Sequence, residues 1–479
     1  SKPPKGQEMD DHYFGAIKPK VAEFMADLNE ELWKLGVLSK TEHNEVAPAQ
    51  HELAPIYTTT NVATDHNQLM MEIMQKVAAK HGLVCLLHEK PFAGVNGSGK
   101  HNNWSIATND GQNLLSPGET PYENAQFLLF LCAVIKAVDD YQDLLRISVA
   151  TAGNDHRLGA NEAPPAVISM FLGDELTAVL DAIENDAPYK GAEKTQMKLG
   201  VHVLPKFNRD TTDRNRTSPF AFTGNKFEFR MLGSSNSIAC ANIMLNSAVA
   251  ESLKIYADKL EGEKDFAAAL HDLIKETVKE HKRIIFNGNG YDDAWIKEAT
   301  EVRGLKNYRT TPDCMPHLLD KKNVDMLTSH KVFTVEELKS RCEIMLENYC
   351  KSVTIEANTM IDMAKTEIAP AIERFTADLA KNAAAKKAVA PALACAYETG
   401  LISKLSDLTD RIYASVGELQ SAVIALHDCD GVIAESEAIR DDVLQKMCAL
   451  RLACDEAETL TEKKYWPYPT YADILFSVR

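Results

Sequence analysis

Apolar positions in the first part of the chain recur every three or four residues, which is the period of an amphipathic helix. Over residues 18–35 this spacing predicts one helix, and residues 65–81 and the strongly apolar stretch 124–146 are predicted to be helical in the same way. The apolar face of the first helix consists of Val21, Phe24, Met25, Leu28, Leu32 and Leu35.

Other segments break the helical pattern. Residues 43–60 and 84–107 are rich in Pro, Val, Ile, Tyr and Thr with broken alternation, and each block predicts a pair of short strands joined by Gly, Pro and Asn turns. Residues 226–232 predict a further strand. The stretch 153–165 is rich in Gly, Pro and Asn and is too irregular for either element, so we predict a functional loop there.

Strand signals nearly vanish beyond residue 238, and helical signals replace them. Thr334 and Glu337 form a capping box, in which each side chain satisfies a backbone N–H of the other residue. A heptad-like series over residues 412–426 predicts a helix pair or bundle, and the Ala/Lys stretch 382–390 is predicted to be helical. The aromatic segment 465–476 is predicted to dock on the body.

Composition and charge then limit the function. The net charge is −17, and a polyanion such as nucleic acid is repelled by such a field. The longest apolar run, 127–135, is far shorter than the roughly 20 residues of a bilayer span, so no membrane segment is expected. None of the ten cysteines falls in a C-x-x-C pair, which favours buried free thiols in a reducing cytoplasm.

A glycine-rich segment, Gly94-Val-Asn-Gly-Ser-Gly-Lys100, fits the spacing of a phosphate-binding P-loop. The next residue is His101, where such a loop needs Ser or Thr for Mg²⁺, and the following residues are strand-like. Two interpretations remain: glycines that let the backbone approach a small ligand, with His101 at the mouth of a strand, or a plain surface turn.

Acidic and basic side chains occur in two further patterns. Glu45 and Glu52 flank a Pro-containing strand, and their oxygens suit Mg²⁺ or Mn²⁺, although two acids on a solvated edge are the alternative. Alternation puts Lys226, Glu228 and Arg230 on one strand face, which suits a phosphate beside a metal or else a surface salt-bridge ladder. Basic residues also cluster just before this strand, at Arg209, Arg214 and Arg216.

Five motifs follow one another along the chain: Glu45…Glu52, Asn96-Gly-Ser-Gly-Lys-His101, Gly159-Ala-Asn-Glu-Ala-Pro164, Asn215-Arg-Thr-Ser218 and Lys226-Phe-Glu-Phe-Arg230. Their order and rough spacing resemble those of glutamine synthetases. With Pro4-Lys-Gly-Gln-Glu near the start and Trp466-Pro-Tyr-Pro-Thr-Tyr near the end, the sequence resembles the long third class of that family over essentially the whole chain.

The resemblance implies an ATP-dependent ligase that phosphorylates the γ-carboxylate of L-glutamate and lets ammonia displace the phosphate, giving glutamine. Two or more Mg²⁺ or Mn²⁺ sites are implied. Glu45 and Glu52 match ligands of one metal, and His101 and Glu228 match ligands of the other, which bridges the nucleotide phosphates.

The other assignments concern the substrates. Asn96 and Gly97 match the glutamate-binding turn, with Arg157 and Arg230 on the carboxylates of glutamate. Glutamate, ammonium and ATP are the implied partners.

The resemblance also implies which residues contact ATP, the transferred phosphoryl group and ammonium. Ser105 and Lys226 match nucleotide contacts, and Arg216 matches the clamp on the transferred phosphoryl group. Glu162 matches the flap carboxylate that closes over the site and deprotonates ammonium. Lys226 stands where family members carry arginine, which keeps the charge but loses bidentate geometry.

The implied fold class is α+β, with an antiparallel-sheet catalytic domain covered by helices and then a large helical region. Residues 1–255 are predicted to form the catalytic domain, 256–464 the mostly helical region, and 465–479 a docking C-terminal segment. The family's β-grasp domain and Glu-x-Glu strand are expected upstream of Ser1, so the site is expected to be incomplete in this chain alone.

Family membership also implies a cytoplasmic homo-oligomer of stacked rings, with active sites shared between neighbouring subunits. Two alternatives stay open. One is a catalytically silent ring-forming or regulatory homologue that binds nucleotide, and the other is a γ-glutamyl ligase for another amine.

Overall fold

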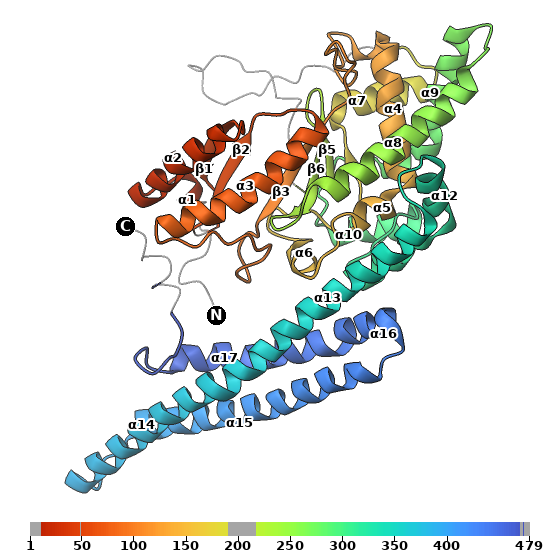
Figure 1. Ribbon diagram of the computed structural model, residues 1–479. Helices are drawn as coiled ribbons and strands as arrows, with labels where there is room; N and C mark the ends of the chain where they lie inside the picture. The colour runs from red at the N-terminus through yellow and green to blue at the C-terminus, as the bar shows by residue number, and fades with distance from the viewer. Residues whose placement is uncertain (1–10, 48, 190–216, 470–472, 474–479) are drawn as a thin grey trace, which may run out of the picture.

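The computed structural model describes residues 11–47, 49–189, 217–469 and 473 (Figure 1). Two sheets and their covering helices form the body, and a group of long helices extends from it (Figure 1). Within the described residues, no helix combines the length and apolar character that a membrane crossing requires.

A small sheet carries the first acidic motif. Strands β1 (Ser39–Asn44) and β2 (His51–Pro55) pair antiparallel, next to the short helix α1 (Asp11–Phe14). Helices α2 (Pro19–Lys34) and α3 (Thr60–Lys80) pack beside the sheet. Their own small core, which fixes the position of the hairpin, consists of Leu28, Leu32, Val37, Met70 and Val77.

A four-stranded sheet lies at the centre of the body, in the order β3-β6-β5-β4. Neighbours are antiparallel except β4 and β5. Phenylalanines on one face of β6 enter the main core, and this directs Glu228 and Arg230 to the opposite face. The strands are β3 (Gly99–Trp104), β4 (Met170–Phe171), β5 (Phe220–Phe222) and β6 (Phe227–Gly233).

Helices of the body enclose this sheet. The almost wholly apolar α4 (Ala125–Asp140) packs against α8 (Ala239–Leu260) and α9 (Phe266–His281). Shorter helical elements complete the body: η2 (Pro121–Glu123), α5 (Gln142–Ile147), α6 (Ala152–Arg157), α7 (Gly173–Glu184), η3 (Lys282–Ile284), α10 (Asp293–Lys297), η4 (Glu298–Val302), α11 (Thr311–Cys314), η5 (Met315–Leu319) and α12 (Lys321–Ser329).

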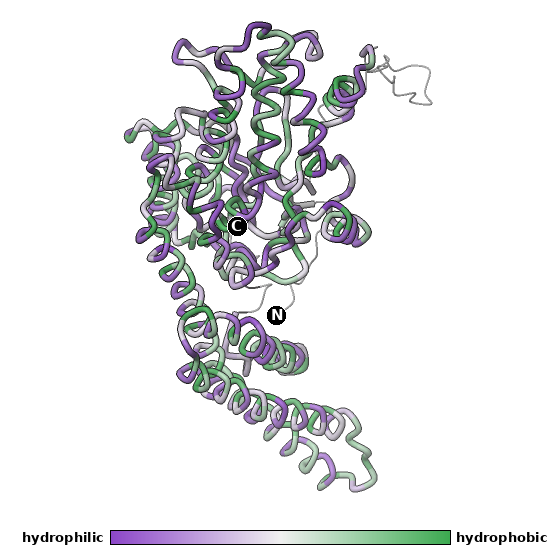
Figure 2. The backbone as a smooth tube through the Cα atoms, turned by 90° about the vertical axis from the view of Figure 1, so that its right-hand side faces the viewer, coloured by the Kyte–Doolittle hydropathy of each residue, from purple (hydrophilic) through white to green (hydrophobic). Residues whose placement is uncertain are grey.

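Long helices form the C-terminal part and extend away from the body (Figure 2). Its apolar core also includes Ala152 of α6, and the aromatic residues Tyr465, Trp466 and Tyr468 pack against it. The elements are α13 (Val335–Met363), η6 (Ala364–Ile368), α14 (Ala369–Val389), α15 (Ala396–Ala425), η7 (Leu426–Asp428), α16 (Gly431–Ala438), η8 (Ile439–Val443) and α17 (Leu444–Leu460).

Several elements agree with the sequence predictions. Helices α2, α3 and α14 cover or nearly cover the predicted segments 18–35, 65–81 and 382–390, and β6 matches the strand predicted at 226–232. The capping box is confirmed: the Glu337 N–H donates to Thr334 Oγ1 over 3.2 Å, and the Thr334 N–H donates to Glu337 Oε2 over 2.8 Å.

Three predictions are wrong in part. Of the strand pair predicted at 84–107 only β3 forms, because residues 84–98 pair with no strand among the described residues, whereas β3 pairs with β6. The loop predicted at 153–165 begins as α6, since the Thr151 hydroxyl caps the helix by accepting from the Asn154 N–H over 3.2 Å. The helix predicted at 124–146 is divided at Tyr141 into α4 and α5.

Candidate active site

The β1–β2 hairpin brings two carboxylates and an imidazole together. His43 lies opposite Glu52 in the register, and Glu45 follows His43 by two residues, so all three side chains share one face. The Nε2 atom of His43 is 3.0 Å from Glu45 Oε1 and 3.4 Å from Glu52 Oε2. The predicted ligands Glu45 and Glu52 are therefore neighbours.

Crowding of negative charge changes the acidity of this group. Burial, followed by the hydrogen bond and charge repulsion from Glu52 and the charge of Glu162, raises the pKa of Glu45 to about 8. Ligand atoms of His43, Glu45 and Glu52 lie within 4.8 Å of one another. This donor set fits a divalent cation, because carboxylate oxygens suit Mg²⁺ and Mn²⁺ and a neutral imidazole suits Mn²⁺.

Strands β3 and β6 provide the second predicted pair. His101 Nδ1 lies 3.0 Å from Glu228 Oε1, with the Glu228 side chain buried and that of His101 partly exposed. The register of the two strands shifts between Lys100 and Asn102, so His101 sits at an irregularity that can re-aim a side chain. Thus the two residues matched to the other metal are also in contact.

The glycine turn, the hairpin and the loop after α6 meet at one place. The Asn96 amide donates to Glu162 Oε2 over 3.1 Å, and the Gln50 amide, from the hairpin turn, donates to the carbonyl oxygen of Gly97 over 2.9 Å. The charge of Glu162 also acts on Glu45. The structure therefore brings the predicted residues Asn96, Gly97, Glu162 and Glu45 into one neighbourhood.

Glu162 has an unusual backbone. Its φ is 67°, and that of Asn161 is 53°, a left-handed conformation that costs a non-glycine residue on the order of 1 kcal/mol. Turn hydrogen bonds hold the loop: the Gly159 N–H donates to the Pro164 carbonyl, and the Ala163 N–H donates to that of Ala160. Such strain is common at functional sites. Glu162 remains outside α6, as a flap residue requires.

Arg157 lies behind the glycine turn. Its guanidinium donates to the backbone carbonyls of Arg230, Met231 and Leu232 over 3.2–3.3 Å. Burial lowers the pKa of Arg157 to about 10, and the side chain is only 4% exposed. Added Cβ atoms at Gly97 and Gly99 would collide with this region, so these glycines permit the close approach. Arg230, the second predicted carboxylate ligand, is buried on β6.

Glu89 is a buried carboxylate that our sequence reading missed. Ser235 donates to it through both its backbone N–H and its hydroxyl, and added Cβ atoms at Gly153 and Gly233 would collide with its side chain. Its charge also favours the cationic form of Arg157. Glu89 thus links the glycine turn, α6 and β6. No sequence signal marks it, because its neighbours come from distant segments.

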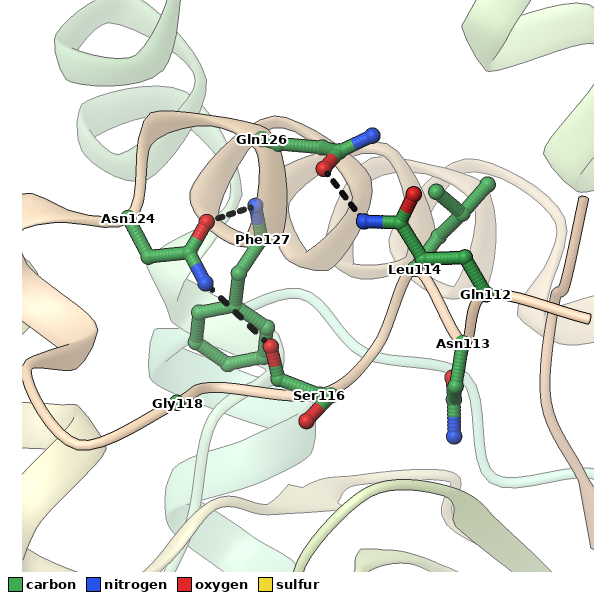
Figure 3. Close-up of a pocket in the computed structure, with 8 residues that line it drawn as sticks. All are labelled: Gln112, Asn113, Leu114, Ser116, Gly118, Asn124, Gln126 and Phe127. Atoms are coloured by element: carbon green, nitrogen blue, oxygen red, sulfur yellow. Dashed lines mark hydrogen bonds between the residues drawn. The ribbon is translucent and has the colours of Figure 1, made fainter.

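The predicted nucleotide contacts, Ser105 and Lys226, lie at the other ends of β3 and β6. Ser105 Oγ donates to Asn113 Oδ1 over 2.8 Å and to the Asn225 carbonyl over 3.1 Å. A hollow of about 350 Å³ adjoins them, and the side chains of Gln112 and Gln126 are hydrogen-bonded at its rim (Figure 3). Its lining consists of Gln112, Asn113, Leu114, Ser116, Gly118, Asn124, Gln126 and Phe127.

The remaining candidate residues are the arginines before β6 and an acidic group at the end of α4. The predicted clamp Arg216, with Arg209 and Arg214, lies outside the described residues. Asp139, Asp140 and His281 form another potential metal group, but cationic side chains already engage it. Arg283 Nε contacts both Asp139 oxygens at 2.8 and 3.0 Å, and Lys136 donates to Asp140 over 2.7 Å. It is an ion-pair cluster within the body.

Comparison with known proteins gives consistent results along the chain. Residues 4–168 match the family described as glutamine synthetase, catalytic domain, and residues 269–387 match the glutamine synthetase C-terminal domain. A glutamine synthetase of Butyrivibrio fibrisolvens is 49% identical over 99% of this chain and 68% of its own length. A type-3 glutamine synthetase of Dictyostelium discoideum is 43% identical over 99% of this chain and 66% of its own length.

This chain spans about two thirds of the length of those relatives. The matches confirm the resemblance predicted from the five motifs, including the third class. By sequence and by these matches, the chain belongs to the glutamine synthetase family.

Proposed function

We propose that the protein ligates ammonia to L-glutamate with ATP, through a γ-glutamyl phosphate, and gives glutamine. The observation that supports this most strongly is the meeting of the hairpin carboxylates, the glycine turn and Glu162, each of which comes from a different motif. Family membership gives independent support.

Two groups of residues would hold the divalent metals. Glu45 and Glu52, with His43 beside them, form one group, and His101 with Glu228 forms the other. When bound, Mg²⁺ or Mn²⁺ would neutralise the nucleotide phosphates and polarise the transferred phosphoryl group. The high pKa of Glu45 fits this role, since the carboxylates repel one another and a cation would relieve that repulsion.

Substrate binding is proposed for the glycine turn and its surroundings. Asn96 and Gly97 would contact glutamate, with Arg230 and Arg157 supplying positive charge near its carboxylates. In the structure the Arg157 donors engage backbone carbonyls of β6, so its part is to hold the turn and contribute charge at short range. Glu162 would accept a proton from ammonium. Its carboxylate adjoins the Asn96 amide and therefore lies beside the turn that is proposed to bind glutamate.

ATP is proposed to bind near Ser105 and Lys226, where the adjoining hollow offers amide groups for a purine base. The clamp role of Arg216 rests on sequence alone. A guanidinium there would stabilise charge that grows on the transferred phosphoryl group. Arg216→Ala should therefore lower kcat by about 10²-fold while the affinities for ATP and glutamate change little.

A cytoplasmic homo-oligomer of stacked rings, with active sites shared between neighbouring subunits, is part of the same proposal. Its support is the family membership. Analytical ultracentrifugation of the full-length protein would measure the assembly, and a monomer with full activity would contradict shared sites.

The experiment for the activity is a steady-state assay of the full-length protein with ATP, L-glutamate, ammonium and either Mg²⁺ or Mn²⁺. Glutamine and phosphate should form in equal amounts. Glu162→Gln should lose most of the turnover, whereas Glu119→Gln, in an exposed turn, should not. Nucleotide binding without glutamine would identify a silent homologue, and faster turnover of methylamine than of ammonium would identify another amine ligase.

A further inference from the structure

Tyr291 lies outside every motif of the sequence, between η3 and α10. Its ring is half-buried, and its hydroxyl oxygen is shielded from solvent. That oxygen forms no hydrogen bond with any residue that the structure describes. Buried polar groups are nearly always hydrogen-bonded. A buried hydroxyl without a partner in the described protein therefore indicates that a bound molecule supplies its hydrogen bond.

The backbone around Tyr291 is firmly held. Asn287 Oδ1 accepts from the N–H groups of Leu172 and Gly173, both over 3.1 Å, and the Gly290 N–H donates to Thr217 Oγ1 over 2.7 Å. The N–H of Tyr291 itself donates to Asn289 Oδ1 over 3.1 Å. These contacts fix where the ring enters the body, so the position of the hydroxyl is set by the fold.

The charges of residues in the proposed glutamate site act on this hydroxyl. Burial raises the pKa of Tyr291 to about 12, the guanidinium charges of Arg230 and Arg157 act against that change, and the Glu162 carboxylate adds to it. The backbone N–H of Glu162 also faces the phenolic oxygen, but it does not meet hydrogen-bond geometry with that oxygen. Because the pKa lies far above neutrality, the hydroxyl remains protonated and can donate a hydrogen bond.

We propose that the Tyr291 hydroxyl donates a hydrogen bond to a carboxylate oxygen of the amino-acid substrate, beside Arg230. This rests on the proposed function of the site. A carboxylate fits this position because its oxygens accept a hydrogen bond from an O–H group and its charge is attracted by two guanidinium groups. Ammonium has no acceptor, and the nucleotide phosphates are expected at the metal that His101 and Glu228 would hold.

The alternative recipient within the protein is the Glu162 carboxylate. In the structure Glu162 Oε2 instead accepts from the Asn96 amide, which comes from the other side of the site. If the hydroxyl donated to Glu162, it would support proton transfer, and its removal would lower kcat. If it donates to the substrate, its removal raises the KM for glutamate.

The test is Tyr291→Phe in the full-length protein, which removes one oxygen and keeps the ring. The KM for glutamate should rise about tenfold or more, as expected for one lost hydrogen bond to a charged group. The KM for ATP and kcat should stay within about twofold. An unchanged KM for glutamate would overturn the proposal, and so would a fall in kcat at constant KM.

Tyr256→Phe is the matched control. Its hydroxyl is also buried, but it is hydrogen-bonded to Thr277 Oγ1 over 2.8 Å within the main core. That variant should lower the unfolding temperature and leave the KM for glutamate unchanged.

Calorimetric titration with L-glutamate separates this inference from the proposed function. If the wild-type protein binds glutamate but forms no glutamine, the function fails, and weaker binding by Tyr291→Phe would still support the hydroxyl contact. Equal binding by both proteins would overturn the contact even where glutamine is formed.

Discussion

The Nδ1 atom of His101 lies 3.0 Å from Oε1 of Glu228, on neighbouring antiparallel strands of the central sheet. The hairpin group of His43, Glu45 and Glu52 belongs to a separate sheet. Since each group is built on its own pair of strands, removal of one carboxylate should disturb one group and leave the other folded.

Close packing of the glycine turn gives a first prediction. A Cβ at Gly97 would collide with the carbonyl oxygen of Glu89 and approach the Arg157 side chain to 3.1 Å. Gly97→Ala should therefore destabilise the protein and raise the KM for glutamate, since the turn must move.

Gly417→Ala, in the exposed face of α15 with open space around it, is the control. It should stabilise by about 0.5–1 kcal/mol, because alanine is the better helix former. Urea unfolding measures both variants. A Gly97→Ala protein as stable as the parent would show that the turn tolerates a side chain.

A buried ion pair beside α6 gives a second prediction. Arg146 is 1% exposed and contacts Asp155 at 2.7 Å, and burial raises the pKa of Asp155 even though Arg146 opposes this change. Asp155→Ala would leave a buried guanidinium without its counter-ion, which costs about 3–5 kcal/mol. Denaturant unfolding should show that loss. Asp325→Ala removes an exposed i,i+4 partner of Lys321 in α12 and should change stability little. Equal effects of the two variants would contradict the account.

The contact between α14 and α15 should make stability depend on pH. The hydrogen bond from Lys386 lowers the pKa of Glu398 below 4.5 and raises that of Lys386 above 10.5. An acid with a lowered pKa stabilises the folded state above its unfolded pKa, and this contribution is lost as pH falls through the folded value. The contribution of Lys386 to the stability of the folded state is lost as pH rises through the raised pKa of Lys386.

Glu398→Gln should therefore lower the unfolding temperature near pH 7, and the difference from the parent should vanish in strong acid. Glu347→Gln, which removes an exposed i,i+4 partner of Lys351, should have a smaller effect. Thermal unfolding followed by circular dichroism at both pH values is the measurement. A difference that persists unchanged in acid would exclude the ion pair as its cause.

The sequence was sufficient where a local pattern determines the structure. Alternation predicted β6 and the separation of Glu228 from its phenylalanine neighbours. The resemblance to glutamine synthetases implied that His101 and Glu228 bind the same metal, and in the structure the two are in contact. The period of two that places Glu45 and His43 on one strand face was also present in the sequence. Its use would have added His43 to the metal group.

Local sequence patterns do not predict contacts between residues that lie far apart in the sequence. Glu89 is important only because Gly153, Gly233 and Ser235 meet at its carboxylate, and nothing near residue 89 predicts those neighbours. Tyr291 is similar, since its setting depends on Arg230 and Glu162. The first part of the 84–107 segment has strand-like composition but no strand partner, and pairing rather than propensity decides whether a strand forms.

The most direct test of the central claim is Mn²⁺ binding to the full-length protein, measured by titration calorimetry together with glutamine formation. Glu228→Gln should weaken one class of Mn²⁺ site at least tenfold, leave the hairpin class intact and abolish most glutamine formation. Glu45→Gln should weaken the hairpin class of Mn²⁺ site and leave the other class intact. Glu42→Gln is the control on β1, the strand that leads to Glu45, since the Glu42 side chain is hydrogen-bonded to Asn29 instead. Unchanged Mn²⁺ binding and turnover in Glu228→Gln would contradict the assignment of the site.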